Sequence, residues 1–472
     1  MKLSYTNIKA EFVISHGLKR AILTEVGSTA KSLLSSKLTE RSGAPSQSAN
    51  FGSSRRRVEL GLLLLADISV GFAYTLASLG HSDSIPGNLA PFLIVIFGLS
   101  LCCHLANRKF AKQADPVLLP IVALLNGLGY VMIARIDPHL ASLQAVWSAI
   151  GAFAYIVILV LIRRSNDLDR YRYLLALAGG ALMLTPLLPH FGQDINGARL
   201  WVRLGPVTFQ PVEFGKIALA IFFASYLVEK QEMMKTPTAR VGNRLITDPR
   251  PFGPVIVTWL GSLLIMGAER DIGFSALVFS MFVAMLWMAT GRKLFLAVFA
   301  LLLVLGAFIA AHLFPQVNER ISTWINPWSH ASTTGYQAIQ AEYALGSGGL
   351  SGTGLGLGHP GYVPVAVSDY IFSAFGEELG LIGTTIIVVA FMMILGSGIR
   401  IALRAKSQFA SLLAAGLTFT ISLESFFIMA GVVRILPFTG LALPFVAYGG
   451  SSLIANYILI ALLMRISDET RA

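Results

Sequence analysis

Long apolar segments dominate this sequence and decide what it can fold into. An α-helix needs roughly 17–25 mostly apolar residues to cross about 30 Å of hydrocarbon, and twelve such segments follow one another along the chain. The composition agrees, because 55% of the residues are hydrophobic and only 13% are charged, which is far from the composition of soluble globular proteins. We therefore predict an all-α, polytopic integral membrane protein with about 12 transmembrane helices. The predicted spans are 58–80, 88–107, 117–135, 143–162, 173–191, 213–229, 252–268, 273–290, 293–314, 379–404, 409–433 and 444–465.

The segments outside these spans define the domain organisation. Residues 1–57 are Ser-rich and basic and lack the compact apolar core of a cleaved signal peptide, so we predict a mostly disordered cytoplasmic tail. Residues 58–465 form the predicted transmembrane domain, and 466–472 a short C-terminal tail. Within the domain, 315–378 is a connection long enough to suggest a function of its own. The two cysteines are adjacent inside one span, which excludes a disulfide framework.

Lys and Arg residues predict the orientation in the membrane. With the N-terminus inside, 29 of the 36 Lys and Arg residues fall in cytoplasmic segments and six fall outside. Because cytoplasmic loops carry the excess of these residues, both termini are predicted cytoplasmic and residues 315–378 extracytoplasmic. This topology, with the anionic lipid of the inner leaflet, explains the net charge of +11 without a nucleic-acid partner.

The segment 192–219 is unusually polar for a connection between two spans. Its apolar residues interleave with Arg199 and Arg203, which suits a segment lying on the membrane interface with its guanidinium groups near headgroups. Snorkelling arginines beside a Trp anchor explain the same pattern. Glu213 and Lys216 then enter the bilayer on one helical face. They can pair with each other, but ionisable groups inside a membrane usually line a functional cavity, and we favour a functional role.

A glycine tract, GSGGLSGTGLGLG, occupies residues 346–358 within the long extracytoplasmic segment. It does not resemble a nucleotide-binding loop, because no strand–helix unit flanks it and no G-K-[ST] follows. Backbone flexibility is the commoner explanation, and close approach of backbone amides to an anionic ligand is the other.

Carboxylates are the strongest candidates for chemistry. The sequence has no Ser-His-Asp order and no H-E-x-x-H motif, and His359 is a weak candidate for a metal ligand. Asp369 is the strongest candidate for a catalytic residue, although an aspartate before a helix is also an ordinary N-cap. Glu377 and Glu378, beside the start of a predicted span, have the same structural explanation.

Three stretches resemble signature motifs of the SEDS family, the polytopic peptidoglycan polymerases of the RodA and FtsW type. They are NGARLWVRLGPVTFQPVEFGK at 196–216, EYALGSGGLSGTGLGLG at 342–358 running into SDYIFSAFGEELG at 368–380, and PFTGLALPFVAYGGSSLIANY at 437–457. Their order, spacing and predicted sidedness agree with the family. The similarity covers most of the chain from about residue 58 onward.

The sequence also departs from the family pattern. Leu200 stands where the family often has a second basic residue, and Ser368, Asp369 and Tyr370 replace a Thr-Asp-Phe pattern. Asp271, in ERDIGFSAL, matches a family acidic motif only weakly. Five predicted spans precede the first motif where three are common. Two additional N-terminal helices resemble the longer RodA-type members from actinobacteria.

The resemblance implies that the chain polymerises lipid II into β-1,4 glycan strands outside the cytoplasmic membrane, for cell-wall elongation or division. Asp369 is then the general base that takes a proton from the acceptor hydroxyl. The leaving diphosphate needs cationic partners or a divalent cation, Mg or Mn. Inversion requires one displacement, which explains the lack of a nucleophile. The implied substrate-binding residues are Arg199, Arg203, Glu213, Lys216 and Arg320, and the supporting residues are Asp271, Glu377 and Glu378.

The resemblance also implies a partner, a class B penicillin-binding transpeptidase that cross-links the strands. Two functions of other classes remain open on the sequence. A transporter or flippase of the lipid-linked precursor would move the headgroup without forming polymer, and a non-catalytic scaffold for wall synthases would tolerate Asp369→Ala. The polymerase is favoured because the polar, motif-rich segments converge on one predicted membrane face, whereas a transporter needs access from both.

Overall fold

The computed structural model describes residues 47–84, 87, 89–189, 191–195, 198–205, 207–235, 239–241, 244–246, 253–269 and 271–471. The chain divides into two compact units, Met1–Ser54 and Arg55–Ala472. Residues 1–46 of the predicted tail lie outside the described residues. The described chain is already helical at Gln47, so the predicted boundary between tail and first helix at residue 57 falls inside a helix.

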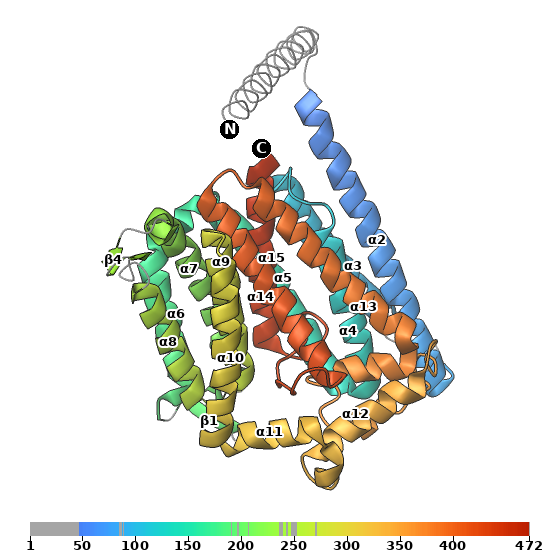
Figure 1. The fold of residues 1–472 in the computed structure, drawn as a ribbon. Helices are drawn as coiled ribbons and strands as arrows, with labels where there is room; N and C mark the ends of the chain where they lie inside the picture. The colour runs from blue at the N-terminus through green and yellow to red at the C-terminus, as the bar shows by residue number, and fades with distance from the viewer. Residues whose placement is uncertain are drawn as a thin grey trace, which may run out of the picture. The chain divides into compact units, whose positions relative to one another are not determined.

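The second unit is a bundle of long helices that run in broadly similar directions (Figure 1). Each predicted span overlaps one of them. The helices are α2 (Gln47–Ser82), α3 (Leu89–Phe110), α4 (Leu118–Ile136), α5 (Pro138–Leu161), α6 (Arg172–Leu184), α7 (Val212–Lys235), α8 (Gly253–Ala268), α9 (Ile272–Thr290), α10 (Lys293–Leu313), α13 (Ile371–Arg404), α14 (Gln408–Val432) and α15 (Gly450–Arg471).

Nine helices of the described residues are long and apolar enough to cross a membrane. The polytopic, all-α architecture is therefore confirmed, whereas the count of twelve spans is not. The three remaining helices fall short for physical reasons. α6 has 13 residues and α8 has 16, which is less than the roughly 17–25 that a perpendicular span needs. α7 is long enough but carries ionisable side chains at both ends.

Helix α15 lies at the centre of the bundle, where it packs along α5 and also contacts α14, α13 and α7 (Figure 1). Its middle residues, such as Leu459 and Leu463, are fully buried. By contrast, α10 exposes Leu301, Val304 and Phe308. In a membrane protein such exposed apolar side chains face lipid, so burial here separates helices of the protein interior from helices of the periphery.

The segment 192–219 has a secondary structure that the sequence analysis did not predict. It forms an antiparallel sheet of β1 (Gly192–Ile195), β2 (Ala198–Leu204) and β3 (Val207–Phe209). The alternation of Arg199 and Arg203 with apolar residues has the period of two that a strand requires. Gly205, at φ +64°, closes the turn between β2 and β3. A second, two-stranded sheet pairs β4 (Ala239–Val241) with β5 (Arg244–Ile246).

Residues 315–378 are more regular than the sequence predicted. They contain α11 (Pro315–Ile325), η4 (Pro327–His330), α12 (Gly335–Gly348) and η5 (Pro360–Tyr362). These helices are too short and polar to be found by a search for apolar runs. Helix α13 begins earlier than the predicted span and contains a break at Gly380, with φ 64° and ψ −161°. The break separates a short first part, which carries Glu377 and Glu378, from the long apolar part.

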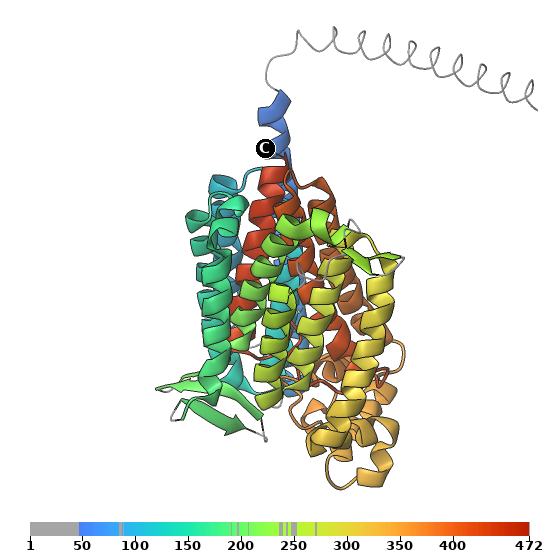
Figure 2. The ribbon, with the colours of Figure 1, turned by 60° about the vertical axis from the view of Figure 1, so that its left-hand side comes forward.

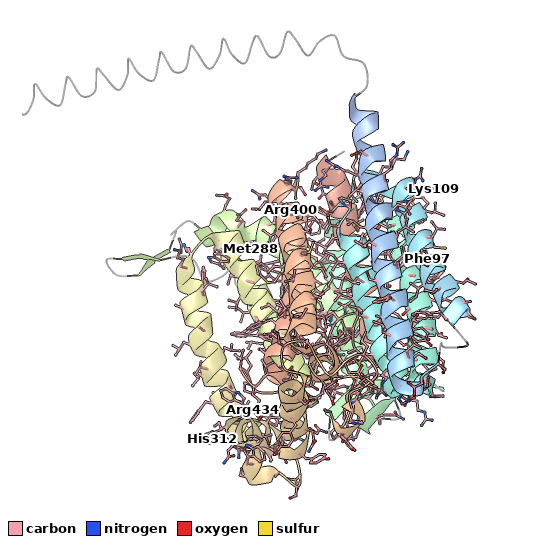
Figure 3. All side chains as sticks on the ribbon, turned by 90° about the vertical axis from the view of Figure 1, so that its right-hand side faces the viewer. Phe97, Lys109, Met288, His312, Arg400 and Arg434 are labelled. Carbon is pink, nitrogen blue, oxygen red and sulfur yellow. The ribbon has the colours of Figure 1, made fainter. Side chains whose placement is uncertain are left out.

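Helices α11 and α12 and the β1–β3 sheet lie at one end of the bundle, opposite the C-terminus (Figures 1 and 2). We call this end the loop end, and the other the C-terminal end. Figure 3 shows Lys109 and Arg400 toward the C-terminal end and His312 and Arg434 at the loop end. The motif-bearing segments therefore gather at the end that the Lys and Arg distribution predicts to be extracytoplasmic.

Candidate functional site at the loop end

Asp369 lies at the loop end, between η5 and the start of α13, and is half-buried. Its neighbours fix its backbone. The Tyr370 ring stacks on Phe438 with centroids 4.5 Å apart, and the Tyr448 amide donates to the carbonyl of Val367 over 2.9 Å. The segment 437–449, the first part of the third sequence motif, therefore contacts the segment that carries Asp369 and fixes its position.

Arg320 of α11 brings a positive charge to two carboxylates that are far apart in the sequence. Its Nη1 donates to the carbonyl of Thr439 over 2.9 Å, and its charge acts on both Asp369 and Asp271. Asp271 is the N-cap of α9, where its side chain accepts from the amide of Phe274 over 3.0 Å. Three candidates from the sequence thus converge, each from a different element.

The pKa values of these acids are raised. Burial raises the pKa of Asp369 to about 6, opposed by a hydrogen bond from Ser368 and the charge of Arg320. Burial also raises the pKa of Asp271 to about 6. The pKa of Glu269 is raised to about 8 by burial and then by the charge of Asp271. A carboxylate with a pKa near 6 is ionised at neutral pH and still basic enough to accept a proton.

A buried ionic cluster lies beneath these groups. Lys216 of α7 places Nζ 2.6 Å from Glu213 Oε2 and 2.7 Å from Glu424 Oε2 of α14. The side chains of all three are at most 1% exposed. The Lys216 ammonium also lies 5.6 Å from the centroid of the Phe274 ring, in the first turn of α9. One ammonium therefore ties three helices together, which is a structural use of a residue that the sequence suggested for diphosphate binding.

Carboxyl groups outnumber cations among the described residues of this region. Among the described residues, five carboxyl groups gather here, and the charges of Lys216 and Arg320 act on four of them. Among the described residues, Asp271 Oδ2, Glu424 Oε1 and both carboxyl oxygens of Glu269 are buried without a hydrogen-bond partner. Because unpaired buried charge is costly, a proton on these groups or a positive charge brought close to them would stabilise the region. The five carboxyl groups are those of Glu213, Glu269, Asp271, Asp369 and Glu424.

The arginines of the first motif are exposed on β2. The amide of Arg199 donates to the carbonyl of Glu269 over 3.0 Å, which anchors the strand next to the acidic residues. Arg203 donates from Nε to the carbonyl of Gly205 over 3.1 Å. Both guanidinium groups are therefore at the loop end and reachable by an anionic ligand.

Glu377 and Glu378 hold the glycine tract. Glu377 Oε1 accepts from the amide of His359 over 2.8 Å, and Glu378 Oε2 accepts from the amide of Gly356 over 3.0 Å. Arg135 of α4 donates to the carbonyls of Gly356 and Gly358 and lies 3.5 Å from Glu378. Neither glutamate caps α13, whose N-cap is Tyr370 and has no side-chain hydrogen bond.

Sequence reasoning missed three residues of this arrangement: Arg135, Glu269 and Glu424. Glu424 was detectable, because a single acid in the apolar run of α14 is the kind of intramembrane charge that marks a site. Arg135 and Glu269 had no comparable signal, since they lie at the ends of apolar segments, where charges are ordinary. No group of three or more His, Cys, Asp or Glu residues in the described ranges is arranged to hold a metal ion, and this includes the surroundings of His359.

The chain is similar to known proteins over most of its length. The model of the FtsW/RodA/SpoVE family, described as cell cycle protein, matches residues 117–472. The peptidoglycan glycosyltransferase RodA of Mycobacterium tuberculosis is 38% identical over 429 residues, which cover 88% of this chain and 91% of that protein. A probable peptidoglycan glycosyltransferase FtsW of Geobacter sulfurreducens is 33% identical over 381 residues, covering 77% of this chain and 98% of that protein.

Two solved structures have the same fold. One is a chain of a peptidoglycan synthase complex, whose structure is described as showing the structural coordination of polymerization and crosslinking. It aligns with a TM-score of 0.62 at 24% identity, covering 76% of this chain and 98% of that chain. The crystal structure of the rod shape determining protein RodA of Thermus thermophilus aligns with a TM-score of 0.53 at 25% identity, covering 75% and 96%. The family match begins at residue 117, so α2 and α3 precede it.

Proposed function

Because the chain belongs to the FtsW/RodA/SpoVE family and is a peptidoglycan glycosyltransferase, we propose that its loop end polymerises lipid II into β-1,4 glycan strands. We further propose that this end faces outward from the bacterial cytoplasmic membrane and that both termini are cytoplasmic. The similar proteins are named for glycosyl transfer, so we no longer favour a flippase or a scaffold function. The distribution of Lys and Arg supports the orientation.

The proposed reaction is a single displacement. A hydroxyl of the acceptor sugar attacks the anomeric carbon of the donor, a new C–O bond forms, and the C–O bond to the diphosphate breaks with inversion. Asp369 accepts the proton of the attacking hydroxyl. The observation that carries this assignment is the position of Asp369, half-buried at the loop end between η5 and α13, where the charge of Arg320 acts on it. The pair supplies a base that is ionised at neutral pH at the surface where a lipid-anchored substrate arrives.

The diphosphate needs positive charge as it leaves. We propose that Arg199 and Arg203 on the exposed face of β2 supply it, with Arg320 closer to Asp369. Lys216 is already shared by two buried carboxylates, so we propose that Lys216 and Glu213 support the site from within the bundle. Asp271 supports it by capping α9 beside Arg320, and Glu377 and Glu378 by holding the glycine tract.

A divalent cation is a proposal of a different kind. The described residues do not form a metal site of their own, so the side chains present do not fit a resident ion. We propose instead that Mg²⁺ or Mn²⁺ arrives as the counter-ion of the diphosphate, attracted by the carboxylates at the loop end. The steps assigned above to Asp369 and the arginines do not depend on it. Titration of activity with a chelator and then with each metal tests this proposal.

We propose that the enzyme works with a class B penicillin-binding transpeptidase. This proposal is supported by the fold that the chain shares with one chain of a peptidoglycan synthase complex, which is described as coordinating polymerization and crosslinking. The proposed function is tested with purified protein and purified lipid II, with and without the transpeptidase. Glycan polymer in either reaction supports it. Headgroup translocation in vesicles without any polymer contradicts it.

A further inference from the structure

Helix α2, which precedes the family match, touches the glycine tract backbone to backbone. Gly80 lies in the last turn of α2, and a Cβ placed on it would lie 2.2 Å from the carbonyl oxygen of Leu355. Real Cβ atoms essentially never approach that closely. Only glycine at this position allows the observed contact.

The contact is reciprocal. Gly356 has φ +83°, and a Cβ there would lie 2.2 Å from the carbonyl oxygen of Ala77 and 2.9 Å from the amide nitrogen of His81. Leu355, whose carbonyl oxygen contacts Gly80, also packs against an apolar cluster formed by α2, α3 and α4. The buried members of that cluster are Val70, Ala73, Tyr74, Ala77, Phe92 and Val131.

The opposite side of the same tract is bound to α13 and α4. The amide of Gly356 donates to Glu378, and its carbonyl accepts from Arg135 over 3.1 Å. Glu378 belongs to the short first part of α13, which begins two residues after Asp369 and ends at the break at Gly380. The break is itself in contact with the tract, because a Cβ on Gly380 would lie 2.3 Å from the amide nitrogen of Gly352.

We propose that the last turn of α2 is a brace that positions the catalytic segment. By pressing on Leu355 and Gly356 it keeps the glycine tract where Glu378 and Arg135 bind it, and this fixes the first part of α13 and the Asp369 that precedes it. The inference rests on the proposed role of Asp369. Gly80 and Leu355 are positioning residues, since they act through the tract and Glu378. The rival explanation is that α2 and α3 only anchor the chain in the membrane.

Two matched pairs of variants test the brace. Gly80→Ala is compared with Gly61→Ala in the same helix, where a Cβ would meet nothing within 4 Å. Both changes raise helix propensity, so only the contact with Leu355 distinguishes them. Leu355→Ala is compared with Leu357→Ala in the same tract, where the side chain is 59% exposed.

Polymerisation kinetics and hydrogen exchange are measured for all four variants. Because small displacements of catalytic groups are costly, we expect Gly80→Ala and Leu355→Ala to lower kcat about tenfold or more. KM for lipid II should change by about twofold or less, since the proposed diphosphate contacts lie on β2. Amides of residues 349–359 should exchange faster in these two variants, and both controls should behave as wild type.

Unchanged kcat in both test variants overturns the brace, whether or not the tract exchanges faster, because α2 would then not position the base. Equal loss in the controls also overturns it, since the effect would not depend on the contact. The wild-type reaction is measured first. If wild-type protein makes no polymer, the proposed function is wrong. This outcome is distinct from failure of the brace, in which the wild type is active and the variants match it.

Discussion

Lys216 in α7 donates a hydrogen bond to Glu424 in α14, with Nζ 2.7 Å from Oε2. The same ammonium lies 2.6 Å from Glu213, one turn away in α7. Two buried carboxylates therefore share one cation. This arrangement carries a formal excess of one negative charge when all three groups are ionised. Removing the lysine should therefore destabilise the protein more than neutralising one carboxylate.

The first prediction follows from that inequality. Lys216→Met removes the cation that the two carboxylates share and leaves them facing each other, and breaking a buried pair costs about 3–5 kcal/mol. Glu424→Gln keeps a hydrogen-bond acceptor and balances the charge, so we expect it to be much milder. Thermal unfolding in detergent, followed with polymerase activity, measures both. Lys230→Met, in the same helix but in an exposed pair with Glu229, is the matched control and should change little.

If Lys216→Met unfolds at the wild-type temperature and polymerises at the wild-type rate, the cluster neither supports the bundle nor the site. If Glu424→Gln is as damaging as Lys216→Met, the charge argument is wrong and the geometry of the hydrogen bond is what matters.

The second prediction concerns pH. The pKa of Asp369 is raised to about 6 by burial, and a general base must be deprotonated. We therefore expect kcat/KM to fall as the pH drops through about 6. The charge of Arg320 lowers this pKa, so Arg320→Gln should raise it and move the acid limb of the profile to higher pH.

Asp271 has a pKa in the same range, so it provides the control for the pH profile. Asp271→Asn should retain an acid limb, whereas Asp369→Asn should lose it together with most of the activity. If the acid limb of the pH profile stays in place in Arg320→Gln but vanishes in Asp271→Asn, the titrating group is Asp271 and not Asp369.

Some of this architecture could be predicted from the sequence because apolar length and period are local properties. Every predicted span overlaps a helix, and the three motifs all lie at the loop end. The grouping of Arg320 with Asp369 and Asp271 was suggested only by resemblance, since these residues come from α11, the start of α13 and the start of α9. Composition does not encode which element ends meet.

The rest could not be predicted for specific physical reasons. The β1–β3 sheet was missed because the alternation around Arg199 and Arg203 was interpreted as interfacial, although period two also fits a strand. The start of α13 was placed too late because Glu377 and Glu378 end the apolar run on which the predicted span was based. The contact of Gly80 with Leu355 is invisible to any reading of α2 alone, because glycine in a membrane helix is common and only the partner gives it meaning.

The third prediction concerns topology. Ser351 is exposed in the glycine tract, and we expect a cysteine placed there to react with an impermeant thiol reagent from outside the cell. Cys102 and Cys103 are replaced first, because Cys102 is exposed. Lys406→Cys, in the exposed connection between α13 and α14, should be labelled only after the membrane is opened. The reverse pattern would place the loop end in the cytoplasm and remove the mechanism.

The last prediction separates the two kinds of acid at the loop end. Asp369→Asn keeps the size of the side chain but removes the base, and loss of a general base typically costs about 10²–10⁴ in rate. We expect a folded, membrane-inserted protein whose lipid II polymerisation falls by that order. Glu377→Gln should be milder, because Glu377 Oε1 accepts from the amide of His359 and a glutamine oxygen can accept the same bond. Polymerisation by each purified variant, at matched insertion, measures the difference. Near-wild-type polymer from Asp369→Asn would mean that another group takes the proton.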